Sequence, residues 1–300
     1  MADVAVVHLA RRQNGIAPFQ RFLQSMGAHE AGVPHDLVIL FKGFKRVSLE
    51  YDRVLEGIPH RRLLMSDRGF DINAYFEAAK QLDYPSFCFL NSYSRVLADG
   101  WLEKLYSRIR CSGVGLVGAT GSYQSIAGGY TSQERSLEDL APAARVWMRI
   151  RRALADRRSH ALSQRALRVV LRLIGVWRPA RDFAPFPNYH LRTNAFMATR
   201  DMMGRIKFGS LRMKHSAYKF ESGKEGLTNQ VLNLGSQVLV VGRNGEAYEP
   251  ERWHLSNTFW QSSEENLLVA DNQTELYLSS DAATRAELAD YAWGHYARPG

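Results

Sequence analysis

Short apolar runs that alternate with helical segments constrain this sequence more than any other feature. The runs have the length of strands buried on both faces of a sheet, and the segments between them have the spacing of one-sided helices. Such alternation favours an α/β fold with a mostly parallel central sheet flanked by helices. We expect strands at 4–9, 36–41, 62–65, 86–90, 114–117, 190–199 and 237–241, and helices at 18–26, 71–82, 101–109, 227–234 and 282–296.

The composition is that of a globular protein. The chain has 300 residues, of which 45% are hydrophobic and 23% charged, so a mostly disordered chain is excluded. No apolar run approaches the roughly 20 residues of a membrane-spanning helix, and the N-terminal residues lack the pattern of a secretory signal. We therefore expect one domain over residues 1–300, a cytoplasmic location, and reduced, buried thiols at Cys88 and Cys111.

The positive charge is concentrated in one segment. Between Arg145 and Arg181 there are eleven arginines and one acidic residue, Asp156. This segment therefore has a net charge of +10, the rest of the chain has −1, and the whole chain has +9. We interpret residues 140–182 as a basic helical insert with amphipathic helices at 143–155 and 162–177. Its arginines and apolar residues lie on different faces, which suits an anionic membrane surface. A helical pair packed on its own domain explains the pattern equally well. Nucleic acid is not an expected partner because no binding motif accompanies the charge.

Polar and cationic residues follow the expected strands. In open α/β sheets, ligands bind at the carboxyl ends of the strands, near the point where the strand order reverses. Guanidinium groups and glycine-rich turns suit a phosphate-bearing ligand, although each loop alone is also ordinary turn chemistry. The candidates for binding such a ligand are Arg11, Asn14, Lys42, Asp67, Arg68, Asp71, Asn91, Ser92 and Ser94. Phosphate-loop, dinucleotide, hydrolase-elbow and zinc-protease motifs are absent from the sequence.

The order of these segments resembles the GT-A glycosyltransferases. The stretch RGFDINAYFEAAKQLDYPSFCFLNSYSRVLADGWLEKL carries the resemblance, and its start at Arg68–Ile72 is similar to a motif of rhamnan-synthesis F-like proteins. The later stretch that begins with a glutamate and continues as LTNQVLNLG is similar to the acidic motif before the last core helix of these enzymes, which include the bacterial family-two-type glycosyltransferases. The resemblance covers roughly residues 3–122 and 188–245. It implies a Rossmann-like sheet and transfer of a sugar from a nucleotide-sugar donor to a glycan or lipid-linked acceptor in surface polysaccharide synthesis.

The sequence departs from that family at its metal-binding motif. Where the resemblance predicts Asp-x-Asp, the chain has Asn91-Ser92-Tyr93-Ser94. An amide carbonyl is a weaker ligand than a carboxylate for Mn²⁺ or Mg²⁺. Either Asp71 or the late His254 holds the metal, or arginine and lysine neutralise the diphosphate. The alternative is a degenerate, non-catalytic GT-A-like protein that binds a glycan or scaffolds a membrane-associated assembly.

Two glutamates precede the helix expected at 227–234. Inverting glycosyl transfer needs a base that takes the proton from the acceptor hydroxyl, and Glu221 or Glu225 could serve. Either one could instead be an exposed acid that stabilises a helix N-terminus. His190, Arg192 and Asn194 interrupt an otherwise apolar strand, so we expect them either to bind the acceptor or to be hydrogen-bonded inside the fold.

Overall fold

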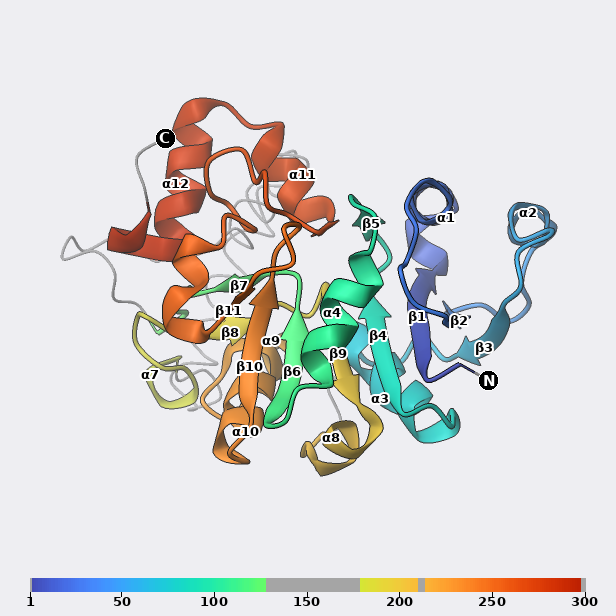
Figure 1. Cartoon of the computed structure of the whole chain (residues 1–300), viewed down its shortest axis with the longest axis horizontal. Helices are drawn as coiled ribbons and strands as arrows, with labels where there is room; N and C mark the ends of the chain where they lie inside the picture. The colour runs from blue at the N-terminus through green and yellow to red at the C-terminus, as the bar shows by residue number, and fades with distance from the viewer. Residues whose placement is uncertain (1, 128–178, 210–213, 298–300) are drawn as a thin grey trace, which may run out of the picture.

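The chain folds around an eight-stranded sheet (Figure 1). The computed structural model describes residues 2–127, 179–209 and 214–297. The strand order is β11-β10-β6-β9-β4-β1-β2-β3. In sequence order these strands are β1 (Val4–Arg11), β2 (Asp36–Lys42), β3 (Arg61–Met65), β4 (Ser86–Leu90), β6 (Val114–Gly118), β9 (Ala195–Thr199), β10 (Gln237–Val241) and β11 (Ala247–Tyr248).

Most of the sheet is parallel, as predicted. Strands β1 to β4 pair in parallel, and β6 pairs in parallel with β10. Strand β9 runs antiparallel between β4 and β6, and the short β11 closes the sheet antiparallel to β10. Val7 and Leu9 of β1 belong to one hydrophobic cluster and Val6 and Ala10 to the other. Alternate residues of a strand face opposite sides of a sheet, so both faces of this sheet are covered.

The helices form two layers. Aromatic and aliphatic residues of α1, α2 and α4 cover one face, and those of α3, α8, α9 and α10 cover the other. Phe22 and Leu105 are fully buried, and burial of each such side chain contributes roughly 1.5–3 kcal/mol to folding. The helices are α1 (Ala17–Ala28), α2 (Leu49–Val54), α3 (Asp71–Gln81), α4 (Trp101–Ile109), α7 (Pro179–Asp182), α8 (Arg200–Arg205), α9 (Lys214–Ser222), α10 (Leu227–Asn233), α11 (Asn272–Leu278) and α12 (Ala282–Trp293), with 3-10 turns η1 (Arg12–Asn14), η2 (Pro250–Leu255) and η3 (Gly294–Tyr296).

The single strand expected at 190–199 is wrong. The chain forms β8 (His190–Leu191), which pairs with β7 (Gly121–Ser122), and enters the central sheet only at β9. The polar residues 192–194 lie between the two strands because their side chains and amides bond to Thr120, to Glu221 of α9 and to Asp271 rather than to a neighbouring strand. The loop expected at 118–129 likewise contains β7. Cys111 also departs from expectation, since it is exposed at the end of α4, whereas Cys88 is buried.

The basic insert falls almost entirely outside the described residues. Only its last residues, in α7, are described, so the two amphipathic helices remain predictions. None of the helices in the described part of the chain is long and apolar enough to cross a membrane.

The C-terminal segment gathers over the carboxyl ends of the strands. Strand β12 (Val269–Ala270) pairs antiparallel with β5 (Arg95–Val96), which follows β4. This pairing places the start of α11 beside the turn after β4, and α11 and α12 lie beyond the tips of the strand arrows in Figure 1. The topology therefore brings residues near 91, 120, 192 and 271 to one edge of the sheet.

Candidate functional site

The strand order reverses between β1 and β4. The chain passes from β1 outward to β2 and β3, then returns to add β4 on the other side of β1. Ligand sites of open α/β sheets form at such a point, outside the carboxyl ends of the strands. Two polar clusters flank it. One follows β1, β2 and β3, and the other follows β4, β6 and β8.

Lys42 organises the first cluster. Its side chain is 1% exposed, and Nζ donates a 2.7 Å hydrogen bond to the carbonyl of Gly69. Nζ also lies 3.7 Å from Asp67 Oδ1 and 3.8 Å from Asp71 Oδ1. Burial lowers the pKa of Lys42, and the negative charge of Asp71 opposes that effect. The ammonium therefore occupies the space between two carboxylates.

The turn before α3 is specified by Gly69. Its φ is +73°, and a Cβ at this position would lie 2.6 Å from the Asn73 side chain. Asn73 Oδ1 accepts the amide hydrogen of Phe70, which begins the helix. The turn places Asp71 in the first helical turn, and Arg68 is exposed on the same turn.

Asp71 is the residue of this cluster whose side chain has an oxygen without a hydrogen-bond donor. Its Oδ1 is buried and makes no hydrogen bond within the described residues. Burial raises the pKa of Asp71, while Lys42 and then Arg11 lower it. Arg11 itself donates to Asp67 Oδ1 at 3.3 Å, and Asn14 ends the turn that follows β1. A hydroxyl or N–H of a ligand would supply the donor that Asp71 lacks.

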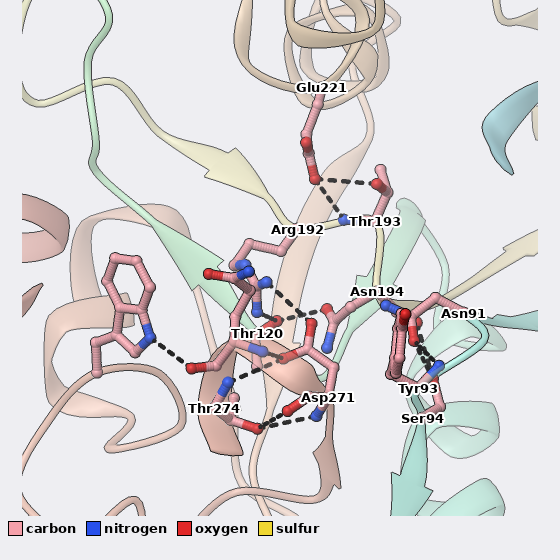
Figure 2. A network of polar contacts seen from close by, with 12 residues as sticks. Asn91, Tyr93, Ser94, Thr120, Arg192, Thr193, Asn194, Glu221, Asp271 and Thr274 are labelled. Atoms are coloured by element: carbon pink, nitrogen blue, oxygen red, sulfur yellow. Dashed lines mark hydrogen bonds and ion pairs between the residues drawn. The ribbon is translucent and has the colours of Figure 1, made fainter. Parts of the chain in front are cut away.

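The turn after β4 uses its own amide oxygen. Asn91 Oδ1 accepts the backbone N–H of Tyr93 at 2.9 Å and the hydroxyl of Ser94 at 3.1 Å (Figure 2). Ser94 and the Asn91 N–H also contact the carbonyl of Asn194. Ser92 Oγ is buried and has no hydrogen-bond partner within the described residues. The oxygen that a metal would need is therefore already bonded inside the turn.

A second chain of contacts lies across from that turn. Asn194 Oδ1 accepts from Thr120 Oγ1 at 2.7 Å, and Arg192 Nη2 donates to Asp271 Oδ2 at 3.0 Å. Figure 2 shows Asn194 between the Asn91–Ser94 turn and the Arg192–Asp271 pair. Asn194 Nδ2 is buried without a hydrogen-bond partner among the described residues. This amide is a second group that a ligand could satisfy.

Arg192 is held from three sides. Besides its ion pair, its guanidinium lies 4.0 Å from the centroid of the Phe259 ring, and its backbone N–H donates to the carbonyl of Thr120. Asp271 is 1% exposed and caps α11, accepting the N–H groups of Gln273 and Thr274 through Oδ1. One carboxylate thus serves both the helix end and the arginine.

The two candidate bases lie in different surroundings. Glu221, half-buried in α9, accepts both the N–H and the hydroxyl of Thr193 through Oε1, at 3.0 and 2.9 Å. It is therefore attached to the same 192–194 turn as Arg192 and Asn194 (Figure 2). Glu225 is exposed just before α10. The imidazole of His190 is buried, its Nδ1 lies 2.8 Å from the carbonyl of Asn188, and burial lowers its pKa.

The two expected metal ligands are placed in different neighbourhoods. Asp71 lies beside Lys42, whereas Nδ1 of His254 lies 3.1 Å from the Tyr123 hydroxyl. Over residues 2–127, 179–209 and 214–297, no three His, Cys, Asp or Glu side chains form a group suited to a metal ion. Asp71 and His254 therefore do not belong to one shared group of metal ligands in the described part of the chain.

Three residues in or near the second cluster were given no site role by the sequence analysis. Asp271 could have been identified as a helix cap from its spacing to Thr274, because an acid three residues before a hydroxyl is typical of a helix start. Thr120 has only the signal that it follows the strand predicted at 114–117, and Glu264 carries no local signal. Glu264 is 4% exposed, accepts the N–H of Trp260, and lies close enough to Asp271 for the negative charge of Asp271 to raise its pKa.

Comparison with known proteins gives a partial structural likeness. No family model and no curated protein sequence matches the chain. Among solved structures, a mannosyltransferase, PcManGT from Pyrobaculum calidifontis in complex with GDP-Man and Mn²⁺, matches 39% of this chain and 34% of its own, with 15% identity and a TM-score of 0.33. TarS from S. aureus matches 45% of this chain and 23% of its own, with 11% identity and a TM-score of 0.32. This chain therefore spans about a third of the mannosyltransferase and about a quarter of TarS. The chemistry proposed for the site is argued only from the residues and distances described above.

Proposed function

We propose that this chain is a glycosyltransferase that moves a sugar from a nucleotide-sugar donor to a hydroxyl of a glycan or lipid-linked acceptor. The observation that carries the proposal is the buried, unbonded Oδ1 of Asp71 beside Lys42, at the sheet edge where the strand order reverses. The resemblance of residues 68–105 to GT-A enzymes supports the same assignment.

The first cluster would bind the donor. Asp71 Oδ1 would accept a hydrogen bond from the nucleoside, and Arg11 lies at the same edge with a guanidinium that suits phosphate oxygens. Asp67, Arg68 and Asn14 would line this end of the donor, and Ser92 and Ser94 would face the diphosphate. Charge develops on the leaving diphosphate, so stabilising it is the largest task of the site.

Protein cations rather than a metal would neutralise the diphosphate. The resemblance implies Mn²⁺ or Mg²⁺, but Asn91 Oδ1 is bonded within its own turn and Lys42 occupies the space between Asp67 and Asp71. Arg11, Lys42 and Arg68 are cations that this sheet edge offers to the donor.

Glu221 would act as the base. Its carboxylate takes the proton of the acceptor hydroxyl as that oxygen forms a bond to the anomeric carbon, and the bond from that carbon to the diphosphate breaks. The electron pair leaves with the nucleoside diphosphate. Two hydrogen bonds from Thr193 hold the Glu221 carboxylate at the 192–194 turn. Arg192 and Asn194 of this turn would bind the acceptor. Glu225 is the alternative base, and His190 would position this turn.

Titration calorimetry tests the donor site. Parent protein should bind one of a panel of UDP-, GDP- and dTDP-sugars, with equal affinity in EDTA and in Mn²⁺. Asp71→Asn and Lys42→Met should each weaken that binding at least tenfold, about 1.4 kcal/mol. Asp83→Asn is the matched control, because this exposed carboxylate precedes β4 at the opposite edge. No binding of any nucleotide sugar, or equal binding by all variants, would refute the donor site.

A non-catalytic glycan-binding or scaffold protein is the second candidate. Its support is that Asn91 and Glu221 both use their side-chain oxygens to hold the fold together. Donor binding without turnover on any acceptor would favour it. For either candidate we propose a cytoplasmic location in surface polysaccharide synthesis, with the basic insert at the membrane surface.

A further inference from the structure

A pocket separate from both clusters lies in the C-terminal part of the chain. Its volume is about 200 Å³, below the roughly 300–1,000 Å³ of pockets for drug-sized ligands. It is bounded by η2, by the loop that follows it, and by α12. Its lining residues are His254, Leu255, Asn257, Gln261, Ser262, Glu265, Ala289 and Ala297.

Two of the lining amides have unsatisfied oxygens. Gln261 is 8% exposed, and its Nε2 donates to the carbonyl of His254, while its Oε1 is buried without a partner among the described residues. Asn257 Oδ1 is buried and unpartnered in the same part of the chain. Buried polar atoms are nearly always hydrogen-bonded, so two open acceptors in one pocket wall indicate donors that a ligand supplies.

The backbone of this wall is strained. Asn257 and Ser262 have φ values of 54° and 42°, and between them Trp260 has a φ of 48°. Asn257 adopts this left-handed conformation readily, whereas a bulky residue such as Trp260 rarely does, so the strain lies mainly at Trp260, between the two lining residues. Two hydrogen bonds of Trp260 hold this segment in place. Its indole N–H donates to the carbonyl of Gln273 at 3.1 Å, and its backbone N–H donates to the Glu264 carboxyl.

The charge of the wall indicates which ligand it suits. Glu265 is the one carboxylate in the lining, and hydrogen bonds from its own backbone N–H and from Ser263 lower its pKa. None of the described lining residues is Lys or Arg, so the wall does not suit a phosphate. It presents mainly acceptor oxygens together with the Ser262 hydroxyl, which matches a ligand that has no negative charge and is rich in hydroxyl donors.

We propose that this pocket binds a single neutral sugar ring, whose hydroxyls donate to Gln261, Asn257 and Glu265. Phe259 and Trp260 lie between lining residues on the same loop, and they contact Arg192 and Gln273 of α11, so this loop links the pocket wall to the candidate acceptor cluster. The identification of this ring as part of the acceptor glycan rests on the proposed function. The binding of the ring itself does not.

Saturation-transfer NMR tests the pocket. The probes are the methyl glycosides of glucose, galactose, mannose, rhamnose and N-acetylglucosamine, each added to the full chain. We expect transfer to at least one glycoside. Gln261→Ala should weaken this binding at least tenfold, and Gln237→Ala, an exposed residue at the start of β10, should leave it unchanged. Glu265→Gln, which changes an exposed side chain and should fold normally, should weaken it several-fold.

The outcomes separate this pocket from the donor site. No transfer to any glycoside, or equal transfer with parent, Gln261→Ala and Glu265→Gln, overturns the pocket. Asp71→Asn should keep the glycoside signal while losing the nucleotide sugar. Glycoside binding without donor binding in the parent would refute the proposed function and leave the pocket standing.

Discussion

Replacing Glu264 by Gln should stabilise this protein at alkaline pH. Glu264 is 4% exposed; its Oε1 accepts the N–H of Trp260 at 2.7 Å, and its Oε2 is buried without a partner among the described residues. Burial raises the pKa of Glu264 from 4.5 to about 8, and the nearby negative charge of Asp271 adds to the effect. At neutral pH the folded protein therefore holds this carboxyl in its protonated form.

The sign and size of the effect follow from proton linkage. Between pH 4.5 and about 8 the folded protein keeps a proton that the unfolded chain has released. Stability therefore falls as pH rises through this range, and the loss is complete above the folded-state pKa. At about 1.36 kcal/mol per pKa unit, ionising Glu264 costs the folded state roughly 4–5 kcal/mol. Gln keeps the acceptor for Trp260 and has no proton to lose.

Urea unfolding followed by tryptophan fluorescence measures this effect. The free energy of unfolding of Glu264→Gln minus that of the parent should rise by roughly 4 kcal/mol from pH 5 to pH 8.5 and then level off. Glu265→Gln is the matched control on the same loop. The pKa of Glu265 is lowered, so its stabilising contribution is complete above 4.5 and the corresponding difference stays constant over this range. A flat difference curve for Glu264→Gln would show that Glu264 is ionised in the folded protein.

Three further predictions concern catalysis, the acceptor turn and the insert. Glu221→Gln should slow turnover roughly a hundredfold or more without changing donor affinity, the usual scale for a lost general base; full activity in this variant and in Glu225→Gln would remove both from the mechanism. Arg192→Met leaves the buried Asp271 without its cation and should lower the free energy of unfolding by about 3 kcal/mol in urea titrations, with a loss under about 1 kcal/mol contradicting the pair. Anionic vesicles should co-sediment the parent at low salt, because each engaged arginine contributes about 1 kcal/mol, and less in high salt. A variant in which Arg165, Arg168 and Arg172 of the insert are replaced by Gln should sediment less. Equal sedimentation of the variant and the parent would favour helices packed on the domain.

The local pattern of the sequence predicted most strands of the central sheet, although it missed β11 and made β9 part of a longer strand. The apolar runs at 86–90 and 237–241 coincide with β4 and β10, and the helix predicted at 101–109 coincides with α4. These elements are predictable because a strand buried on both faces must be apolar throughout, whatever it packs against. The placement of Lys42 and Asp71 at one sheet edge follows from the same periodicity, since Lys42 directly follows the strand predicted at 36–41 and Asp71 begins the helix predicted after the strand at 62–65.

The second cluster depends on contacts between residues distant in the sequence. Arg192 and Asp271 are 79 residues apart, and Thr120 and Asn194 are 74 apart. Neither pairing has a local signal, because each polar group finds its partner only after β12 pairs with β5 and β8 pairs with β7. By itself, the sequence determined which segments are buried and where the chain turns. Only the tertiary structure decided which polar residues meet, since burial depends on local composition and pairing depends on how the loops fold over the sheet.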